Sequence, residues 1–157
     1  LGDALVSAAE HASVLKTHNI CHSRESGNPW EIPVNSDGVV DLKKHKIVMQ
    51  FTDSDSLSQT IVLGQVKNIR TAWPNADIEV VCHGGGLDLL QTTKSKVNSQ
   101  VAEWSGKGVV FAACNNTMKR RNVKKEDLLS NVIVVPSAMI ELTLKQEQDW
   151  AYVKGGH

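Results

Sequence analysis

The sequence lacks an excess of charge of either sign and lacks any long apolar stretch. Its 157 residues carry 17 basic and 17 acidic side chains, so no overall field favours nucleic acid or an anionic membrane surface as a partner. No apolar run approaches the roughly 18 to 20 residues that span a bilayer. We therefore expect no nucleic acid and no membrane among the partners, and the length indicates one domain with a substantial core.

Cysteine is also scarce, and its spacing argues against both disulfides and zinc. Cys21, Cys82 and Cys114 are odd in number and far apart, so free thiols are expected. The segment "HNICH" brings His18 and His22 close to Cys21, but this spacing matches no standard zinc site, and no metal is predicted. Free thiols favour the cytoplasm. The small residues of "ALVSAAEH", in a chain that starts without Met, keep periplasmic export after signal-peptide removal as the alternative.

The pattern of the chain changes near residue 46. Residues 1–45 have little periodicity and many turn formers, and they are interpreted as an N-terminal arm with room for one helix. From 46 to 157, compact apolar runs alternate with stretches of helical period, which is typical of an α/β domain.

Strands are expected at 46–52, 77–83, 108–114 and 131–137, with 150–154 as a closing edge strand. Helices are expected at 55–74, 95–106 and 138–148, with another directly after Cys114. Nearly continuous Val and Ile suits parallel strands covered on both faces. The order predicts a flavodoxin-like three-layer α/β sandwich with a mostly parallel five-stranded sheet, in the strand order 2-1-3-4-5.

Ligands bind at the carboxyl ends of the strands in such sheets, and Cys114 is expected at one of these ends. The residues that follow it can cap a helix, whose first backbone N–H groups, together with nearby cations, would stabilise a thiolate. Cys114 is therefore the candidate catalytic residue. The alternative is that it simply ends a buried strand as a core residue.

Two further loops are expected at the same edge, "TDSDS" and "HGGG". In the expected strand order, the first strand separates His83 from Cys114 by two strand spacings, roughly 10 Å, which argues against a direct Cys–His pair. The Gly84–Gly86 run offers backbone N–H groups to a small anion or a partner's loop, although a tight turn is favoured. Asp53 and Ser54 would lie nearer the thiol loop, with helix capping as the simpler interpretation. The candidate substrate- or partner-binding residues are Asp53, Ser54, His83, Gly84, Gly85, Asn115, Asn116 and Thr117.

The segments "GVVFAACNNTMKRRNVKKEDLL" and "VIVVPSAMIELTLKQEQDWAYVKGG" resemble the DsrE/DsrF-like proteins, a sulfur-relay group that includes small YchN-like members. The resemblance covers roughly residues 46 to 154. It implies a flavodoxin-like fold, assembly into homotrimers or homohexamers, and, in the sulfur-relay members, a cysteine that carries sulfur as a persulfide. Cys114 is the matching position.

Two functions follow as hypotheses. In the first, the protein is a sulfur carrier or sulfurtransferase-like protein that accepts a persulfide on Cys114 from a donor protein and passes it to an acceptor, with no metal or organic cofactor required. In the second, it is a noncatalytic oligomeric module that binds a small ligand or a protein. Exposure of the sulfur in a basic cleft favours the first function, and a shielded sulfur favours the second.

Overall fold

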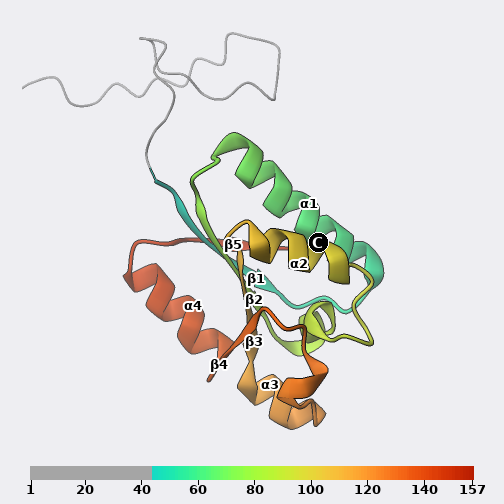
Figure 1. The fold of residues 1–157 in the computed structure, drawn as a ribbon. Coiled ribbons are helices and arrows are strands. Elements are labelled where there is room, and N and C mark those ends of the chain that lie inside the picture. The colour runs from blue at the N-terminus through green and yellow to red at the C-terminus, as the bar shows by residue number, and fades with distance from the viewer. Residues whose placement is uncertain (1–43) are drawn as a thin grey trace, which may run out of the picture.

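The computed structural model describes residues 44–157, so the predicted N-terminal arm, including Cys21 and "HNICH", lies outside the described residues. The described part forms a five-stranded sheet flanked by helices (Figure 1). Its elements are β1 Lys46–Phe51, α1 Ser56–Ala72, β2 Asp77–Cys82, η1 Gly84–Leu90, α2 Asn98–Gly106, β3 Val110–Cys114, α3 Asn115–Arg121, η2 Lys125–Asp127, β4 Val132–Val135, α4 Ala138–Glu147 and β5 Ala151–Lys154, where η denotes a 3-10 helix. The predicted α/β fold is confirmed.

The strand order is β4-β3-β2-β1-β5, so the predicted order 2-1-3-4-5 is wrong. The β2 strand lies between β1 and β3, with Cys82 opposite Phe51 on one side and Ala113 on the other. All of the pairings are parallel, including that of β5 with β1. Strands that are apolar throughout fit any interior position, so the hydrophobic pattern does not determine which strands are neighbours.

The winding of the chain explains how helices cover both faces. From β1 to β4, each strand is added on the same side of the previous one, and the connection through α4 then returns to the opposite edge at β5. Right-handed crossovers in opposite directions place their helices on opposite faces. Figure 1 shows α1 and α2 on one side of the sheet and α4 on the other.

The ends of α1, the longest helix, are set by a capping side chain at its start and by a proline after its end. The Asp55 side chain accepts a hydrogen bond from the Ser58 backbone N–H at 2.8 Å, which caps the first turn of α1. Val62 and Val66 are buried at the predicted helical spacing, and the helix ends at Trp73, directly before Pro74.

Two apolar clusters fill the space on either side of the sheet. The cluster on the α1 and α2 side includes Phe51, Phe111 and Cys82. The cluster on the α4 side includes Cys114 and Leu142. Successive side chains of a strand point to opposite faces, and this alternation separates the two cysteines. None of the helices within residues 44–157 is long and apolar enough to cross a membrane.

Candidate functional site

Cys114 lies where the helical connections change from one face of the sheet to the other. After β3 the chain enters α3, whose Met118 packs in the cluster on the α1 and α2 side. After the neighbouring strand β4 the chain enters α4, whose Leu142 packs in the opposite cluster. Adjacent strands whose connections leave on opposite faces define the topological switch point, where α/β proteins bind their ligands.

The sulfur of Cys114 is enclosed and hydrogen-bonded. The residue is 4% exposed and precedes α3 as its N-cap. The backbone N–H of Ala138, the first residue of α4, donates to the Cys114 Sγ at 3.3 Å. This donor was not predicted from the sequence. Its sequence signal is the Val-Pro-Ser turn that starts α4: because β4 lies beside β3, α4 begins at the level of Cys114.

The surroundings of Cys114 shift its pKa in opposing directions. Burial acts most strongly and raises the pKa. The hydrogen bond from the Ala138 N–H lowers it, as do the nearby N–H and hydroxyl of Thr117 and the N–H of Asn116. The donors together outweigh burial, so the pKa of Cys114 lies below its ordinary value of 9.0. A lowered pKa increases the thiolate fraction near neutral pH, and the thiolate is the nucleophile.

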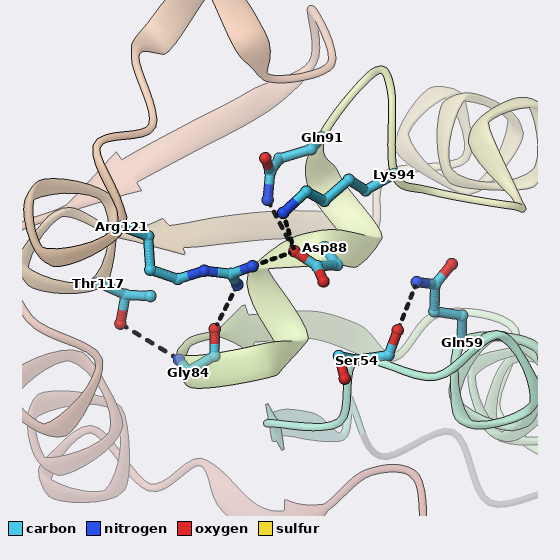
Figure 2. A network of polar contacts seen from close by, with 8 residues as sticks. All are labelled: Ser54, Gln59, Gly84, Asp88, Gln91, Lys94, Thr117 and Arg121. Atoms are coloured by element: carbon cyan, nitrogen blue, oxygen red, sulfur yellow. Dashed lines mark hydrogen bonds and ion pairs between the residues drawn. The ribbon is translucent and has the colours of Figure 1, made fainter.

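The "HGGG" loop contacts the thiol helix through polar side chains (Figure 2). The Gly84 N–H donates to the Thr117 Oγ1 at 3.2 Å, and the Arg121 guanidinium donates to the Gly84 carbonyl at 2.8 Å. Arg121 also forms an ion pair with Asp88 of η1 at 2.6 Å. In the sequence, Arg121 was only one of the cations near Cys114, but here it holds the loop beside Thr117.

The glycines of this loop are required by its packing. Gly84 has a φ of +57°, in the left-handed region that favours glycine. A Cβ at Gly85 would lie 2.8 Å from the Thr52 carbonyl oxygen, and one at Gly86 would lie 2.3 Å from the Phe51 carbonyl oxygen. These contacts agree with the tight-turn interpretation, and ligand binding by Gly84 and Gly85 stays a prediction.

His83 lies closer to Cys114 than the sequence suggested. Because β2 and β3 are neighbours with Cys82 opposite Ala113, the residues that follow, His83 and Cys114, are one strand spacing apart, about 4.8 Å between backbones. The predicted separation of two spacings is wrong, since it rested on β1 lying between them. Alternation also directs both side chains to the α4 side of the sheet.

The protonation state of His83 follows from its partners. The Gln50 side-chain amide donates to the His83 Nε2 at 2.7 Å, and the Tyr152 hydroxyl donates to the Gln50 Oε1. In this arrangement of the amide, the ring proton belongs on Nδ1. Burial, and to a smaller extent the charge of Arg120, lower the pKa of His83, so the ring is neutral at pH 7.

Asp53 and Ser54 do not lie beside the thiol loop, contrary to expectation, because β2 separates β1 from β3. Asp53 accepts from the Thr52 hydroxyl at 3.2 Å and from the His157 N–H at 3.4 Å. The Ser54 carbonyl accepts from the Gln59 side chain at 3.3 Å (Figure 2). Both residues therefore belong to the β1 to α1 turn.

The remaining candidates begin α3. Asn115 is half-buried and Asn116 is exposed, whereas Thr117 is buried. Cys82 is fully buried in the core. Between residues 44 and 157, no three His, Cys, Asp or Glu side chains come together as a metal site.

The fold and site define an α/β protein with a hydrogen-bonded thiol at the switch point of a parallel sheet. The chain belongs to the DsrE/DsrF-like family, whose model matches residues 34–154, and this confirms the resemblance seen in the sequence. A search of curated proteins gives no match.

Two solved structures share the fold, and both are described as proteins of unknown function. The first, MTH1491 from Methanobacterium thermoautotrophicum, is 29% identical with a TM-score of 0.68, and the match covers 71% of this chain and 99% of the other. The second, BT1422 from Bacteroides thetaiotaomicron, is 16% identical with a TM-score of 0.52, covering 69% of this chain and 93% of the other. The likeness to BT1422 concerns the fold alone.

Proposed function

We propose that this protein is a sulfur carrier that accepts a persulfide sulfur on Cys114. The observation that carries the proposal is the set of N–H and hydroxyl donors around the Cys114 sulfur, which lowers its pKa at the switch point of the sheet. Membership of the DsrE/DsrF-like family supports the same residue, since it matches the sulfur-carrying cysteine of the relay members. We place the activity in the cytoplasm, where thiols remain reduced.

The transfer is a thiol–persulfide exchange that needs no external oxidant, because the Cys114 sulfur is oxidised as the inner sulfur of the donor is reduced. The Cys114 thiolate attacks the terminal sulfur of a donor persulfide, R–S–SH. A bond forms between the Cys114 Sγ and that sulfur, the donor S–S bond breaks, and the donor leaves as the thiolate R–S⁻. The product, Cys114–S–SH, passes its terminal sulfur to an acceptor thiolate by the same step.

His83 fits this scheme as a hydrogen-bond donor to the transferred sulfur. It ends the strand next to that of Cys114, it is neutral, and its proton lies on Nδ1. We expect the donor and acceptor to contact Gly85, Asn115 and Asn116, since these residues follow β2 and β3 at the edge of the sheet where Cys114 lies.

Intact mass spectrometry after treatment with a persulfide donor tests the proposal. The wild-type protein should gain one sulfur atom that a reductant removes, and Cys114→Ser should not gain it. Cys82→Ala and Cys21→Ser are matched controls that should still take up sulfur. Sulfur on Cys82 or Cys21, with Cys114 unmodified, would refute the proposal.

The low exposure of Cys114 favours a second candidate function, the noncatalytic binding module. A sulfur in a residue that is only 4% exposed is not open to a large donor in this conformation. The two functions separate when the donor is varied. A carrier takes up sulfur from a persulfidated protein as well as from a small persulfide. For a binding module, the rate of sulfur uptake from either donor does not exceed the rate measured for the unfolded protein.

We also propose that the protein forms homo-oligomers through the outer face of α4. Met139, Ile140 and Leu144 are 52%, 55% and 45% exposed on this helix, and Ile133 of the edge strand β4 is 47% exposed. A second copy would cover this apolar face, which begins one residue after the Ala138 donor and so borders the thiol. Light scattering should give a multiple of the chain mass, and Ile140→Glu should reduce it. A monomeric wild type would refute this assembly.

A further inference from the structure

The hydroxyl of Thr117 occupies a defined place between the glycine loop and the thiol. Thr117 is 3% exposed, and its Oγ1 accepts a hydrogen bond from the Gly84 N–H at 3.2 Å. A hydroxyl has one proton to donate and lone pairs to accept, so acceptance from Gly84 leaves the proton free for another partner. Cys114 is the N-cap of α3 and Thr117 is the third residue of that helix, so the two buried residues belong to the same first turn.

The Gly84 loop is in turn held by a partly buried charge pair. Arg121 donates through Nη1 to the Gly84 carbonyl at 2.8 Å and through Nη2 to the Asp88 Oδ1 at 2.6 Å. Their side chains are 25% and 14% exposed, so water screens the pair only in part. Charge-assisted bonds of this kind hold their partners more firmly than neutral ones do.

Further contacts to Asp88 fix the far end of this network (Figure 2). The Gln91 side-chain amide donates to the Asp88 Oδ1 at 2.9 Å, and the Lys94 ammonium lies 3.7 Å from the same oxygen. One carboxylate oxygen thus gathers donors from the segment that follows η1 and from α3. The position of Gly84 between Arg121 and Thr117 is therefore set from both sides.

We propose that Thr117 is a positioning residue for Cys114, and that the Asp88–Arg121 pair keeps the Gly84 amide in place so that the Thr117 hydroxyl is directed at the sulfur. This inference rests on the proposed function of Cys114 as the sulfur-carrying nucleophile. It extends that function to residues that never touch a donor, since Arg121 and Asp88 act through Gly84 and Thr117.

The test is the pH profile of Cys114 alkylation by iodoacetamide, which needs no persulfide donor. Thr117→Val keeps the shape of the side chain but removes the hydroxyl, and it should slow alkylation at pH 7 by roughly threefold or more and shift the profile to higher pH. Thr117→Ser restores the hydroxyl and should stay within about twofold of the wild-type rate.

Arg121→Gln tests the outer part of the network, with Lys119→Gln as its matched control. Both substitutions remove one positive charge from α3, but only Arg121 contacts Gly84 and Asp88. Arg121→Gln should shift the profile in the same direction as Thr117→Val by a smaller amount, and Lys119→Gln should leave it near that of the wild type. His83 directly after β2, Arg120 on α3 and Glu141 on α4 remain in every variant, so any effect of these groups is common to all profiles.

Each outcome bears on one part of the inference. A Thr117→Val profile equal to that of the wild type overturns the role of Thr117. Equal profiles for Arg121→Gln and Lys119→Gln overturn the role of the Asp88–Arg121 pair, and this comparison holds even where Thr117→Val fails to fold. Failure of the proposed function would instead show as absence of persulfide on wild-type Cys114, which the alkylation profiles do not measure.

Discussion

Cys82 and Cys114 end neighbouring strands of the same sheet, yet their environments are opposite. Cys82 closes β2 on the α1 and α2 side, is fully buried among apolar side chains, and has its pKa raised by burial. Cys114 closes β3 on the α4 side, where burial is outweighed by backbone and hydroxyl donors and the pKa is lowered. Both residues are almost without solvent exposure, so exposure alone does not separate them.

The two cysteines differ instead in whether backbone N–H groups of neighbouring helices face the sulfur. Apolar side chains offer only dispersion contacts, which do not stabilise a thiolate. A thiol that faces an apolar helix surface therefore remains protonated. A thiol that meets the first residues of two helices finds N–H groups without intrahelical partners. The same residue type at the same kind of strand end is thus inert on one face and activated on the other.

The largest expected effect is on reactivity. In the folded, reduced protein at pH 7, iodoacetamide should modify Cys114 at least about a hundredfold faster than Cys82, because each pKa unit between two thiols changes the thiolate fraction about tenfold. Peptide mass spectrometry over time measures both rates. In denaturant the two rates should converge, and a difference that persisted there would show that the fold is not its cause.

Much of this contrast could be predicted from the sequence, and most of the missing part depends on the order of the strands. The apolar runs and helical periods located the elements, and the strand-to-helix junction located Cys114. The order of the strands could not be obtained, because it depends on which edges pair and not on the pattern within any strand.

That single error had two consequences at the site. It placed β1 between His83 and Cys114, which removed a true neighbour, and it brought Asp53 and Ser54 nearer than they are. Arg121 was missed for a different reason. From sequence alone, a charged side chain at the end of a short helix is predicted to be solvent-exposed. Its contact with the Gly84 loop becomes known only from the structure.

The second prediction compares the two cysteines by their contribution to stability, where Cys82 should have the larger effect. Cys82→Ser should lower the free energy of unfolding by about 1 to 3 kcal/mol, because the buried hydroxyl would lie too far from the Val80 carbonyl to replace the lost hydration. Cys114→Ser should cost less than about 1 kcal/mol, because a serine oxygen can still accept from the Ala138 N–H. Urea unfolding measures both values. A larger loss for Cys114→Ser would mean that its sulfur matters mainly for packing.

The third prediction concerns the sign of the pH dependence. The pKa of Cys114 is lowered on folding, so its contribution to stability grows as pH rises from that lowered value to the ordinary thiol value of 9.0, and is lost as pH falls through the folded pKa. The pKa of Cys82 is raised on folding, so its contribution is lost as pH rises above 9.0. In reducing buffer, the wild type should gain stability relative to Cys114→Ser toward pH 9 and lose it relative to Cys82→Ala above pH 9. Slopes of the same sign for both cysteines would contradict the assignment of their environments.

The smallest expected effect concerns His83, which follows Cys82 in sequence but accompanies Cys114 in space. Its pKa is lowered first by burial and then by the charge of Arg120, so Arg120→Gln should raise the pKa of His83 while leaving it below the ordinary value of 6.5. NMR titration of the imidazole protons measures the shift, and Lys119→Gln is the matched loss of charge. An equal shift in both variants would mean that the overall charge of α3, and not the position of Arg120, acts on the ring. Because His83 is neutral at pH 7 in the wild type and in Arg120→Gln alike, alkylation of Cys114 at that pH should barely change. The hydrogen bonds of Ala138 and Thr117, more than any neighbouring charge, then account for the difference between the two thiols.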